Sequence, residues 1–417
     1  MNSKAFQVLR DKYDFQWEVL DVIISGKSLI DLNRGLTGVP LRNREEAERF
    51  ITSYGFSLED PIEKAEIFGH FHEALAFVRK YFLKPENPEG LELEIPRKIL
   101  ELTDIRDLLL MASVRFPGQM QDREGVGLQR WACSLLKVMH TLAHLDKDLR
   151  NAYFSQIQNQ ILDRFYKLAH RDEDGRLYLG ENHHDPLKVD LVAFETKPKK
   201  SRESMVLKLL HKADSVSEDI FDQVGVRFVT YTRLDALRVV KYLKDQTILM
   251  PANIKPSRSR NTLIAIEPLR GVLGDLLSQA EAGVLSENEL QLELEALLQG
   301  EFDKDQQNPH SSDEYRAMQF TVRQLIKLRN PVFDEVRALR EWNTKEELPL
   351  EVKKTIDRID FKYIKRELRF FYPFEVQIMD EKSAEENERG RSAHHEYKKA
   401  QLLTAMKRVM GPLLDPT

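Results

Sequence analysis

The chain has one cysteine, Cys133, in 417 residues. A single cysteine cannot form an internal disulfide or a zinc site built from several thiolates, so the sequence fits a reducing compartment. No apolar run is long enough to span a bilayer, and residues 1–20 lack the apolar core and cleavage site of a secretory signal. We therefore expect a cytoplasmic protein without a membrane-spanning segment.

A large excess of charge of one sign is absent as well. The 63 Lys and Arg residues nearly balance the 68 Asp and Glu residues, which leaves a formal net charge of −5. This balance creates no global field that would attract nucleic acid or an anionic membrane, so any polyanion site must come from local clustering. The length allows two or three domains with a substantial core.

Strand signals are sparse before residue 170, and helical periodicity dominates there. Apolar residues recur at helical spacing in Glu45–Tyr54, Pro61–Phe82, Pro96–Val114, Gly127–Leu142 and Lys147–Leu168. We predict a helical domain of unknown role over residues 1–146, followed by a second domain over residues 147–417.

The second domain mixes strand and helix patterns. Strand patterns occur at Leu187–Phe194, Val224–Phe228, Thr262–Ile266, Tyr315–Ile326 and Phe370–Met379, and helical patterns at Leu234–Leu243, Leu269–Gly300, Lys345–Arg369 and Glu381–Met410. The leucine-rich stretch and the polar loop after it indicate a helical insertion near residues 269–312. The fold class expected is α+β, with a mixed sheet flanked by helices.

A basic cluster precedes a short predicted helix. Ser201 can cap this helix, whose inward stripe is Met205, Val206, Leu209 and Leu210, and whose opposite face carries Ser204, Lys208 and His211. Lys197, Lys199, Lys200 and Arg202 crowd at the helix N-terminus, where backbone N–H groups and the helix dipole favour anions. The segment is typical of a polyphosphate site, although basic clusters are often only solvated surface.

Two acidic residues are placed on predicted strands. Asp222 lies at the start of the strand that contains Val224 and Val226, and Glu375 lies beside Val376 with its side chain directed away from the core. The two carboxylates could meet across a sheet and share a Mg²⁺ ion that bridges phosphate oxygens. Each acid taken alone could equally be an ordinary surface residue.

Three separated motifs carry a resemblance to a known family. They are KSRESM at residues 200–205 with Lys208 after it, DQVGVR at 222–227, and EVQIMDEKSAEENERGRSAHHEYK at 375–398. Their order and spacing resemble those of the RelA/SpoT-type nucleotidyltransferases, alarmone synthetases that transfer pyrophosphate from ATP to the 3′-hydroxyl of GDP or GTP. A weaker fourth match is YRAMQFTV at 315–322. The resemblance covers roughly residues 185–245 and 312–405.

The resemblance implies a fold, a cofactor and a set of site residues. It implies a nucleotidyltransferase-like mixed sheet, Mg²⁺ held by Asp222 and Glu375 as the catalytic acids, and ATP with a guanine nucleotide as partners. The ATP phosphates would be bound by Lys197, Lys199, Lys200, Ser204, Lys208 and Arg227. The acceptor would be bound by Tyr315, Gln319, Gln377 and His394.

Departures from the family pattern keep other functions open. Pro198 replaces an expected arginine, Gln319 replaces a histidine, and Asp313 and Glu314 precede Tyr315 where the family has Asn-Gly. One alternative is pyrophosphate transfer to another 3′-hydroxyl acceptor, such as an adenine nucleotide or the tRNA 3′ end. Another is a non-catalytic nucleotide-binding regulatory protein. In each case the N-terminal helical domain could recruit a protein or RNA regulator.

His140 and His144 form a further candidate pair. Their spacing would allow both side chains to bind one metal ion from the same helix face. The neighbouring Leu142 and Leu145, however, make this an ordinary amphipathic helix. We interpret the two histidines as structural residues.

Overall fold

The computed structural model describes residues 41–113, 123–197, 200–211, 223–299, 315–345, 348–359, 364–389 and 391–414, together with Lys12 and Ile24. It is 58% helix and 18% strand, which confirms the expected α+β class. Contacts divide the chain into two compact units. The helical unit comprises Met1–Ala152, Lys200–Ile220 and His394–Thr417, and the sheet unit comprises Tyr153–Lys199 and Phe221–Ala393. Each unit is thus assembled from segments far apart in the sequence, rather than by one cut near residue 146.

The helical unit contains the helices named next, and α3 shows how capping residues set the two ends of a helix. They are α3 (Arg44–Tyr54), α4 (Pro61–Phe82), α5 (Arg97–Leu100), α6 (Ile105–Ala112), α7 (Arg123–Asp146), α8 (Leu149–Ala152), α10 (Arg202–His211) and α17 (Arg391–Leu414). The Asn43 side chain accepts the N–H of Glu46 at 2.9 Å and so caps α3. Gly55, with φ of 109°, ends that helix in the left-handed conformation that glycine adopts most readily.

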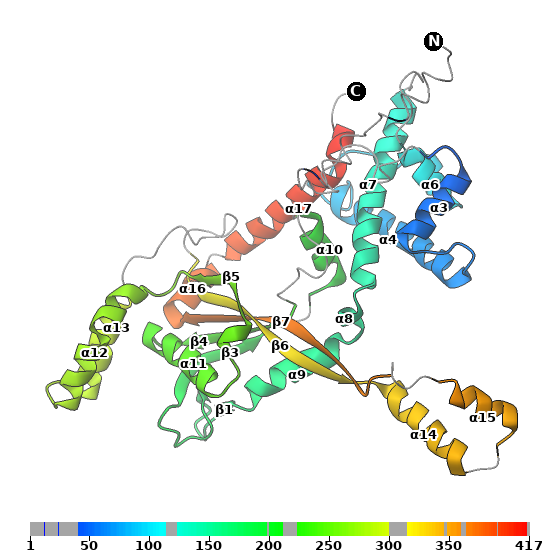
Figure 1. Ribbon diagram of the computed structural model, residues 1–417. Helices are drawn as coiled ribbons and strands as arrows, with labels where there is room; N and C mark the ends of the chain where they lie inside the picture. The colour runs from blue at the N-terminus through cyan, green and yellow to red at the C-terminus, as the bar shows by residue number, and fades with distance from the viewer. Residues whose placement is uncertain are drawn as a thin grey trace. The chain divides into compact units, whose positions relative to one another are not determined.

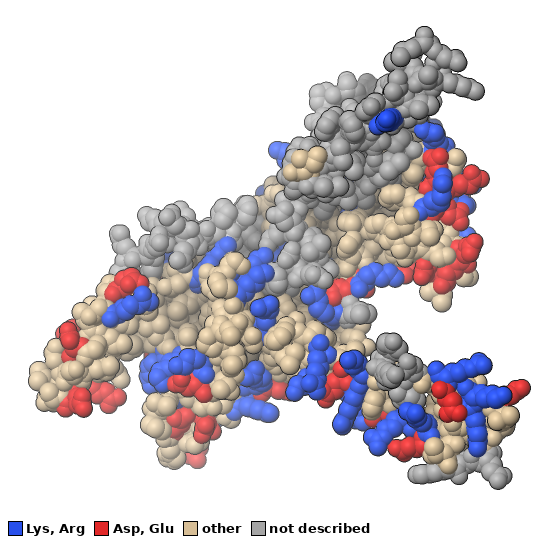
Figure 2. All heavy atoms as spheres, in the orientation of Figure 1, with Lys and Arg blue, Asp and Glu red and all other residues tan. Residues whose placement is uncertain are grey.

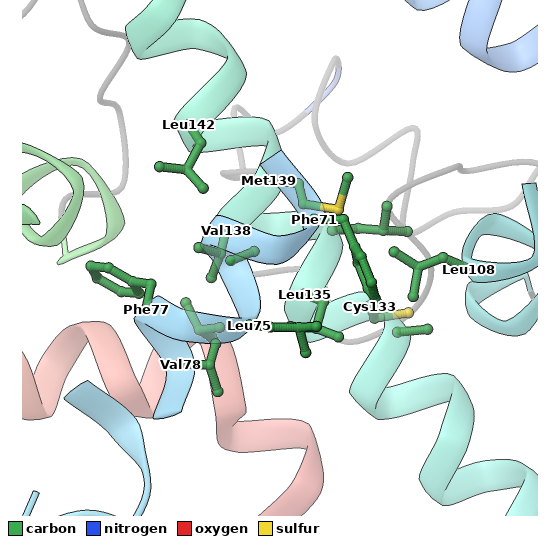
Figure 3. Packing of buried hydrophobic residues seen from close by; sticks show 14 of the residues in the cluster. Phe71, Leu75, Phe77, Val78, Leu108, Cys133, Leu135, Val138, Met139 and Leu142 are labelled. Carbon is green, nitrogen blue, oxygen red and sulfur yellow. The ribbon is translucent and has the colours of Figure 1, made fainter. Parts of the chain in front are cut away.

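An apolar core joins α4, α6 and α7. Figure 3 shows side chains from these helices packed around Phe71, with Leu108 and Met139 among them. Cys133 is 3% exposed and belongs to the same core, where it acts as a small apolar residue. The predicted bounds of the helix Pro61–Phe82 are confirmed. None of the helices in the described ranges combines the length and apolarity needed to cross a bilayer.

The burial of Lys137 in α7 is explained by a proline in α17. Pro412 lies inside this helix and has no N–H, so the carbonyl of Arg408 one turn earlier loses its usual helical donor. Lys137 of α7 is 2% exposed, and its Nζ donates to that carbonyl at 3.4 Å. Ser134 Oγ donates to the adjacent Val409 carbonyl at 2.9 Å. Two polar side chains of α7 therefore fasten the C-terminal turn of α17.

The sheet unit contains a mixed sheet (Figure 1). Within the described residues seven strands occur in the order β1-β2-β3-β4-β7-β6-β5. They are β1 (Ala169–Arg171), β2 (Leu177–Leu179), β3 (Val189–Thr196), β4 (Gly225–Thr230), β5 (Ile254–Asn261), β6 (Met318–Arg329) and β7 (Glu367–Asp380). The pair β4–β7 is parallel, and the other neighbouring pairs are antiparallel.

Helices cover the apolar face of this sheet. α11 (Arg233–Asp245) packs on β3, β4 and β7, and α9 (Phe154–Tyr166) packs on β1 and β6. Val226 and Phe228 of β4 and Val376 of β7 are fully buried on this side. The alternation predicted for residues 224–228 is therefore confirmed. The side chains between these positions are directed to the opposite face, which α16 (Glu381–Arg389) partly covers.

Two helical segments interrupt the sheet. α12 (Ile266–Glu281) and α13 (Glu287–Leu297) form a helical pair after β5, in the region expected to be a helical insertion. Ser286 and Glu289 form a capping box that starts α13. A second pair, α14 (Pro331–Lys345) and α15 (Leu350–Asp357), lies at the end of the long β6–β7 hairpin (Figure 1). The first of these two helices was not expected from the sequence.

Two sequence-based assignments are wrong. The strand expected at Thr262–Ile266 is instead the preceding segment, β5, because the Asn261 side chain accepts the N–H groups of Leu263 and Ile264 and turns the chain. Leu263 and Ile264 lie in a loop, and their side chains are buried in the core. The stretch Lys345–Arg369 is only partly helical, since it ends in the first residues of β7.

Candidate functional site

The strand register places polar side chains from four strands on one face of the sheet. Gly225 pairs with Glu375 and Arg227 with Gln377 across the parallel pair β4–β7. Gln319 pairs with Gln377, and Thr321 with Glu375, across β6–β7. Since paired residues are directed to the same face, these side chains gather in one patch opposite the apolar core. We name this patch the polar face; its members are Lys197, Glu195, Arg227, Gln319, Thr321, Glu375 and Gln377.

Glu375 lies at the centre of the polar face and is 6% exposed. Lys197 Nζ donates to its Oε2 atom, and Gln319 Nε2 donates to its Oε1 atom. Its backbone N–H donates to the carbonyl of Val224 at 2.9 Å. Both carboxylate oxygens are thus engaged by donors from the loop after β3 and from β6, which offsets the cost of burying the charge.

Gly225 makes room for Lys197. The Lys197 N–H donates to the Gly225 carbonyl at 2.8 Å, and the lysine stem then lies directly over the glycine. A Cβ atom at position 225 would come within 2.7 Å of Lys197 Cδ. A steric requirement therefore explains the glycine of the DQVGVR motif, because any side chain there would displace the lysine that binds Glu375.

Arg227 contacts two other members of the polar face, Glu195 and Gln377. Its NH1 atom lies 3.2 Å from Glu195 Oε2, and its Nε and NH2 atoms lie 3.4 and 3.5 Å from Gln377 Oε1. These contacts are long, and the guanidinium is partly exposed. Arg227 can therefore exchange these neutral or surface partners for an anionic ligand at little cost.

Tyr315 lies beside the polar face and next to an apolar cluster. Burial raises the pKa of Tyr315; the charge of Arg227 opposes this rise and the charge of Glu375 adds to it. The ring packs against a cluster formed by Val229, Ala317 and Met379. A partly exposed tyrosine ring, supported by this buried cluster and next to charged side chains, suits a ligand with a flat ring and an anionic group.

The backbone around Tyr315 is held from two sides. Thr262 Oγ1 donates to the Tyr315 carbonyl at 2.9 Å. The Asn387 side chain of α16 accepts the Arg316 N–H at 3.1 Å and donates to the Arg316 carbonyl at 2.9 Å. Sequence analysis assigned no role to either polar residue, and the two side chains hold the backbone at Tyr315 and Arg316.

Edge strand β5 adds cations that sequence analysis missed. Lys255 pairs with Thr321 and Arg260 with Gln319, so both residues belong to the same side of the sheet as Glu375. The segment IKPSRSRN contains three basic residues and one proline, a composition that suits an edge strand. The basic composition was readable from the sequence, but its pairing with β6 was not.

The predicted phosphate-binding helix α10 belongs to the helical unit. Ser201 Oγ accepts the Ser204 N–H at 3.2 Å, and Met205, Val206, Leu209 and Leu210 are buried, as predicted. Lys200 and Lys208 are partly exposed. Lys200, Ser204 and Lys208 all belong to the helical unit.

Arg202 is a structural residue rather than part of a phosphate site. Its NH2 atom lies 2.8 Å from Asp146 and its Nε atom 2.5 Å from Glu73, which joins α10 to α7 and α4. His70 Nε2 lies 2.9 Å from the same aspartate. Burial would raise the pKa of Asp146, but hydrogen bonds from His70 and Arg202 hold it well below its usual range. The role expected for Arg202 from the basic cluster is therefore wrong.

Three predicted site residues cannot be placed. Asp222 and Lys199 lie outside the described residues, and so does the side chain of His394 on α17. The predicted approach of Asp222 to Glu375 stays a prediction for this reason. The structure does bring together Lys197, Arg227, Tyr315, Gln319, Glu375 and Gln377.

The described residues do not by themselves fit a Mg²⁺ site. No group of three or more His, Cys, Asp or Glu side chains suited to a metal occurs in the part of the chain that the structure describes. Glu375 is the acid predicted to bind Mg²⁺, and an ammonium and an amide hold its two oxygens. A hard cation needs several oxygen ligands, and here it would have to displace Lys197.

Comparisons with known proteins add no identification. No protein-family model matches the chain, and neither a curated protein nor a solved structure matches it.

Proposed function

We propose that this chain is a divergent pyrophosphotransferase with a RelA/SpoT-like nucleotidyltransferase fold, which uses ATP as donor and a guanine nucleotide as acceptor. The observation that carries the proposal is the polar face. Motif residues from separated segments meet there around Glu375, with Lys197 and Arg227 as cations and Tyr315 beside an apolar cluster. The proposal also includes Mg²⁺ with Asp222 as its first ligand.

The proposed reaction is a displacement at phosphorus. The acceptor 3′-oxygen bonds to the β-phosphorus of ATP while the bond from that phosphorus to the oxygen it shares with the α-phosphate breaks. AMP leaves, and the hydroxyl proton passes to solvent. Arg227 and Lys197 supply positive charge that can stabilise the charge developing on the transferred group.

Glu375 is a positioning residue in this proposal. Because both of its oxygens accept hydrogen bonds, it is poorly placed to take the acceptor proton. It holds the Lys197 ammonium and the Gln319 amide in fixed positions instead. Tyr315, whose ring packs on the buried cluster of Val229, Ala317 and Met379, would pack against the acceptor base.

Nucleotide turnover tests this proposal. The purified chain is incubated with ATP and GDP or GTP, with and without Mg²⁺, and AMP and the pyrophosphorylated product are measured. We expect AMP formation that falls about 100-fold or more in Arg227→Ala and is lost in Asp222→Ala. Arg270→Ala removes an exposed guanidinium from α12 and should leave the rate unchanged. No AMP with any acceptor would overturn the catalytic proposal.

An acceptor panel separates the guanine-nucleotide proposal from its nearest alternative. The helical insertion α12–α13 and the replacements at Asp313, Glu314 and Gln319 are departures from the family pattern in and next to the sequence segment that the resemblance assigns to the acceptor. If product forms with an adenine nucleotide or at the tRNA 3′ end but not with GDP or GTP, the acceptor assignment is wrong while the donor assignment holds.

A second function is favoured by the ion pair of Lys197 with Glu375. Because this pair and Gln319 already satisfy the buried carboxylate, the chain could bind ATP without transferring pyrophosphate and act as a nucleotide-binding regulatory protein. Saturable ATP binding with no AMP from any acceptor would support this function. The helical unit is then the part we propose to bind a protein or RNA regulator.

A further inference from the structure

The polar face continues outward along the β6–β7 hairpin. The two strands pair without interruption from Met318–Ile378 to Arg329–Glu367. β5 pairs with β6 only as far as Val322, and β4 pairs with β7 only from Glu375. By strict alternation, every second residue beyond these points lies on the same side of the hairpin as Gln319 and Glu375.

This side of the hairpin is exposed and carries a mixed set of side chains, which we call the cationic stripe. Its members are Arg323, Leu325, Lys327 and Arg329 on β6 and Phe371, Arg369 and the acidic Glu367 on β7, while Pro373 on the same side is buried. Leu325 is 40% exposed and Phe371 is 52% exposed. The opposite side carries Ile326 and Leu328, which are buried in the core of the sheet unit. The exposure of the stripe therefore reflects its composition rather than a loose hairpin.

One cross-strand pair within the cationic stripe opposes stability. Lys327 lies directly opposite Arg369, and like charges at such positions repel. Leu325 lies opposite Phe371, so an apolar pair faces solvent. Asp334 binds Arg329 and Glu367 binds Arg369, each at 2.7 Å. Among the residues that the structure describes, no salt bridge to Arg323 or Lys327 is found, although Arg369 and, to a smaller extent, Lys327 lower the pKa of Glu367.

The surrounding segment is basic in a chain that is acidic overall. Residues 323–369 contain 13 Lys and Arg against 9 Asp and Glu, whereas the whole chain has a net charge of −5. Figure 2 shows lysine and arginine atoms gathered over the hairpin and over α14 and α15. The local charge is therefore suited to a polyanion, which the whole chain does not favour.

We propose that the cationic stripe binds single-stranded nucleic acid, with phosphates on Arg323 and Lys327 and a base stacked on Phe371. Cations that alternate with an exposed aromatic ring match a ligand whose charged backbone alternates with flat bases. A duplex keeps its bases paired and stacked, and an acidic peptide offers no flat ring for each charge. Alternate residues of a strand lie about 7 Å apart, so the stripe can follow an extended chain. This binding does not depend on pyrophosphate transfer.

Fluorescence anisotropy without ATP tests the proposal. Labelled single-stranded RNA and DNA of about ten nucleotides are titrated at several salt concentrations. For Arg323→Gln/Lys327→Gln we expect the slope of log affinity against log salt to lose about 1.4 of its magnitude. For Phe371→Ala we expect about tenfold weaker binding with an unchanged slope. A control, Arg49→Gln/Lys64→Gln, removes two exposed cations of the helical unit and should bind as the unchanged protein does.

Protein folding is checked by the thermal unfolding midpoint. Lys327 is repelled by Arg369 and attracted by the partly exposed Glu367, so these effects oppose each other and the double variant should lose binding with little change in the midpoint. Absence of binding to either oligonucleotide would overturn the proposal, and so would equal losses in the control variant. Duplex, polyglutamate or anionic vesicles that compete as well as single strands would also overturn it, because such a result shows that charge alone is recognised. AMP formation is measured separately, so failure of one proposal leaves the other intact.

Discussion

At the scale of single residues, the candidate site depends on how a lysine stem and a glycine fit together. Gly225 has no side chain, and Lys197 crosses it to reach the buried Glu375. The steric conflict that a Cβ would create involves the middle of a flexible lysine rather than backbone. Substitution should therefore move the lysine without unfolding the sheet.

The variant Gly225→Ala tests this arrangement. We expect a change of less than about 1 kcal/mol in the free energy of unfolding, because alanine is tolerated in a strand and the lysine can move. We also expect ATP affinity to fall by about tenfold or more. Gly271→Ala, where a Cβ would meet no atom within 4 Å, should leave ATP affinity unchanged. Unchanged ATP affinity in Gly225→Ala would show that the position of Lys197 does not matter.

Motif spacing predicted some site residues, and tertiary contacts decided the others. Glu375, Gln377 and Arg227 were recognisable because strand alternation directs them away from apolar neighbours in the sequence. Arg202 was misassigned because its acidic partners, Glu73 and Asp146, are distant in sequence. Lys255 and Arg260 were missed because their place depends on a non-local pairing of β5 with β6.

At the scale of elements, a polar side chain in the helical unit replaces a backbone donor that a helix lacks. Pro412 removes one N–H from α17, and Lys137 of α7 supplies a donor to the carbonyl that lost it. No local pattern in the sequence links these two residues. A buried lysine in a predicted helix could be located from sequence, but its partner could not.

A double-variant cycle tests the link between Lys137 and Pro412. Lys137→Met should lower the free energy of unfolding by about 1–3 kcal/mol, since a buried carbonyl loses its donor. Adding Pro412→Ala restores a backbone N–H to that carbonyl and should recover most of the loss. Chemical denaturation of both single variants and the double variant measures the coupling. Strictly additive effects would contradict the link.

The contact between α3 and α7 should make stability depend on pH. Tyr54 Oη lies 2.6 Å from His140 Nδ1, and burial lowers the pKa of His140 to about 4, with the nearby His144 adding to the shift. An unfolded histidine has a pKa of about 6.5, so between these values the unfolded chain binds more protons than the folded chain. Stability is therefore present above pH 6.5 and decreases as the pH falls toward 4.

Urea unfolding at pH 7 and pH 5 measures this dependence. We expect the contribution of His140 to fall by about 2 kcal/mol between these two pH values. His140→Gln should remove that part of the pH dependence, whereas His72→Gln, which replaces an exposed histidine of α4, should retain it. The same pH dependence in His140→Gln and in the unchanged protein would rule out the assigned pKa.

At the scale of the whole molecule, the α+β class and most helices of the helical unit followed from periodicity. The sheet order did not, because it places β7 between β4 and β6 although about 140 residues separate β4 from β7 in sequence. This order is what brings Arg227 of β4 beside Gln377 of β7 and creates the polar face. The polar face thus depends on one non-local strand pairing.

The central claim is that the polar face binds a nucleotide, whether or not turnover follows. Isothermal titration of ATP with Mg²⁺ into the unchanged chain, Arg227→Ala and the exposed control Arg270→Ala tests it most directly. We predict saturable binding to the unchanged chain and the control, and at least tenfold weaker binding to Arg227→Ala. Equal ATP affinity in all three proteins, or no binding to any of them, would contradict the claim.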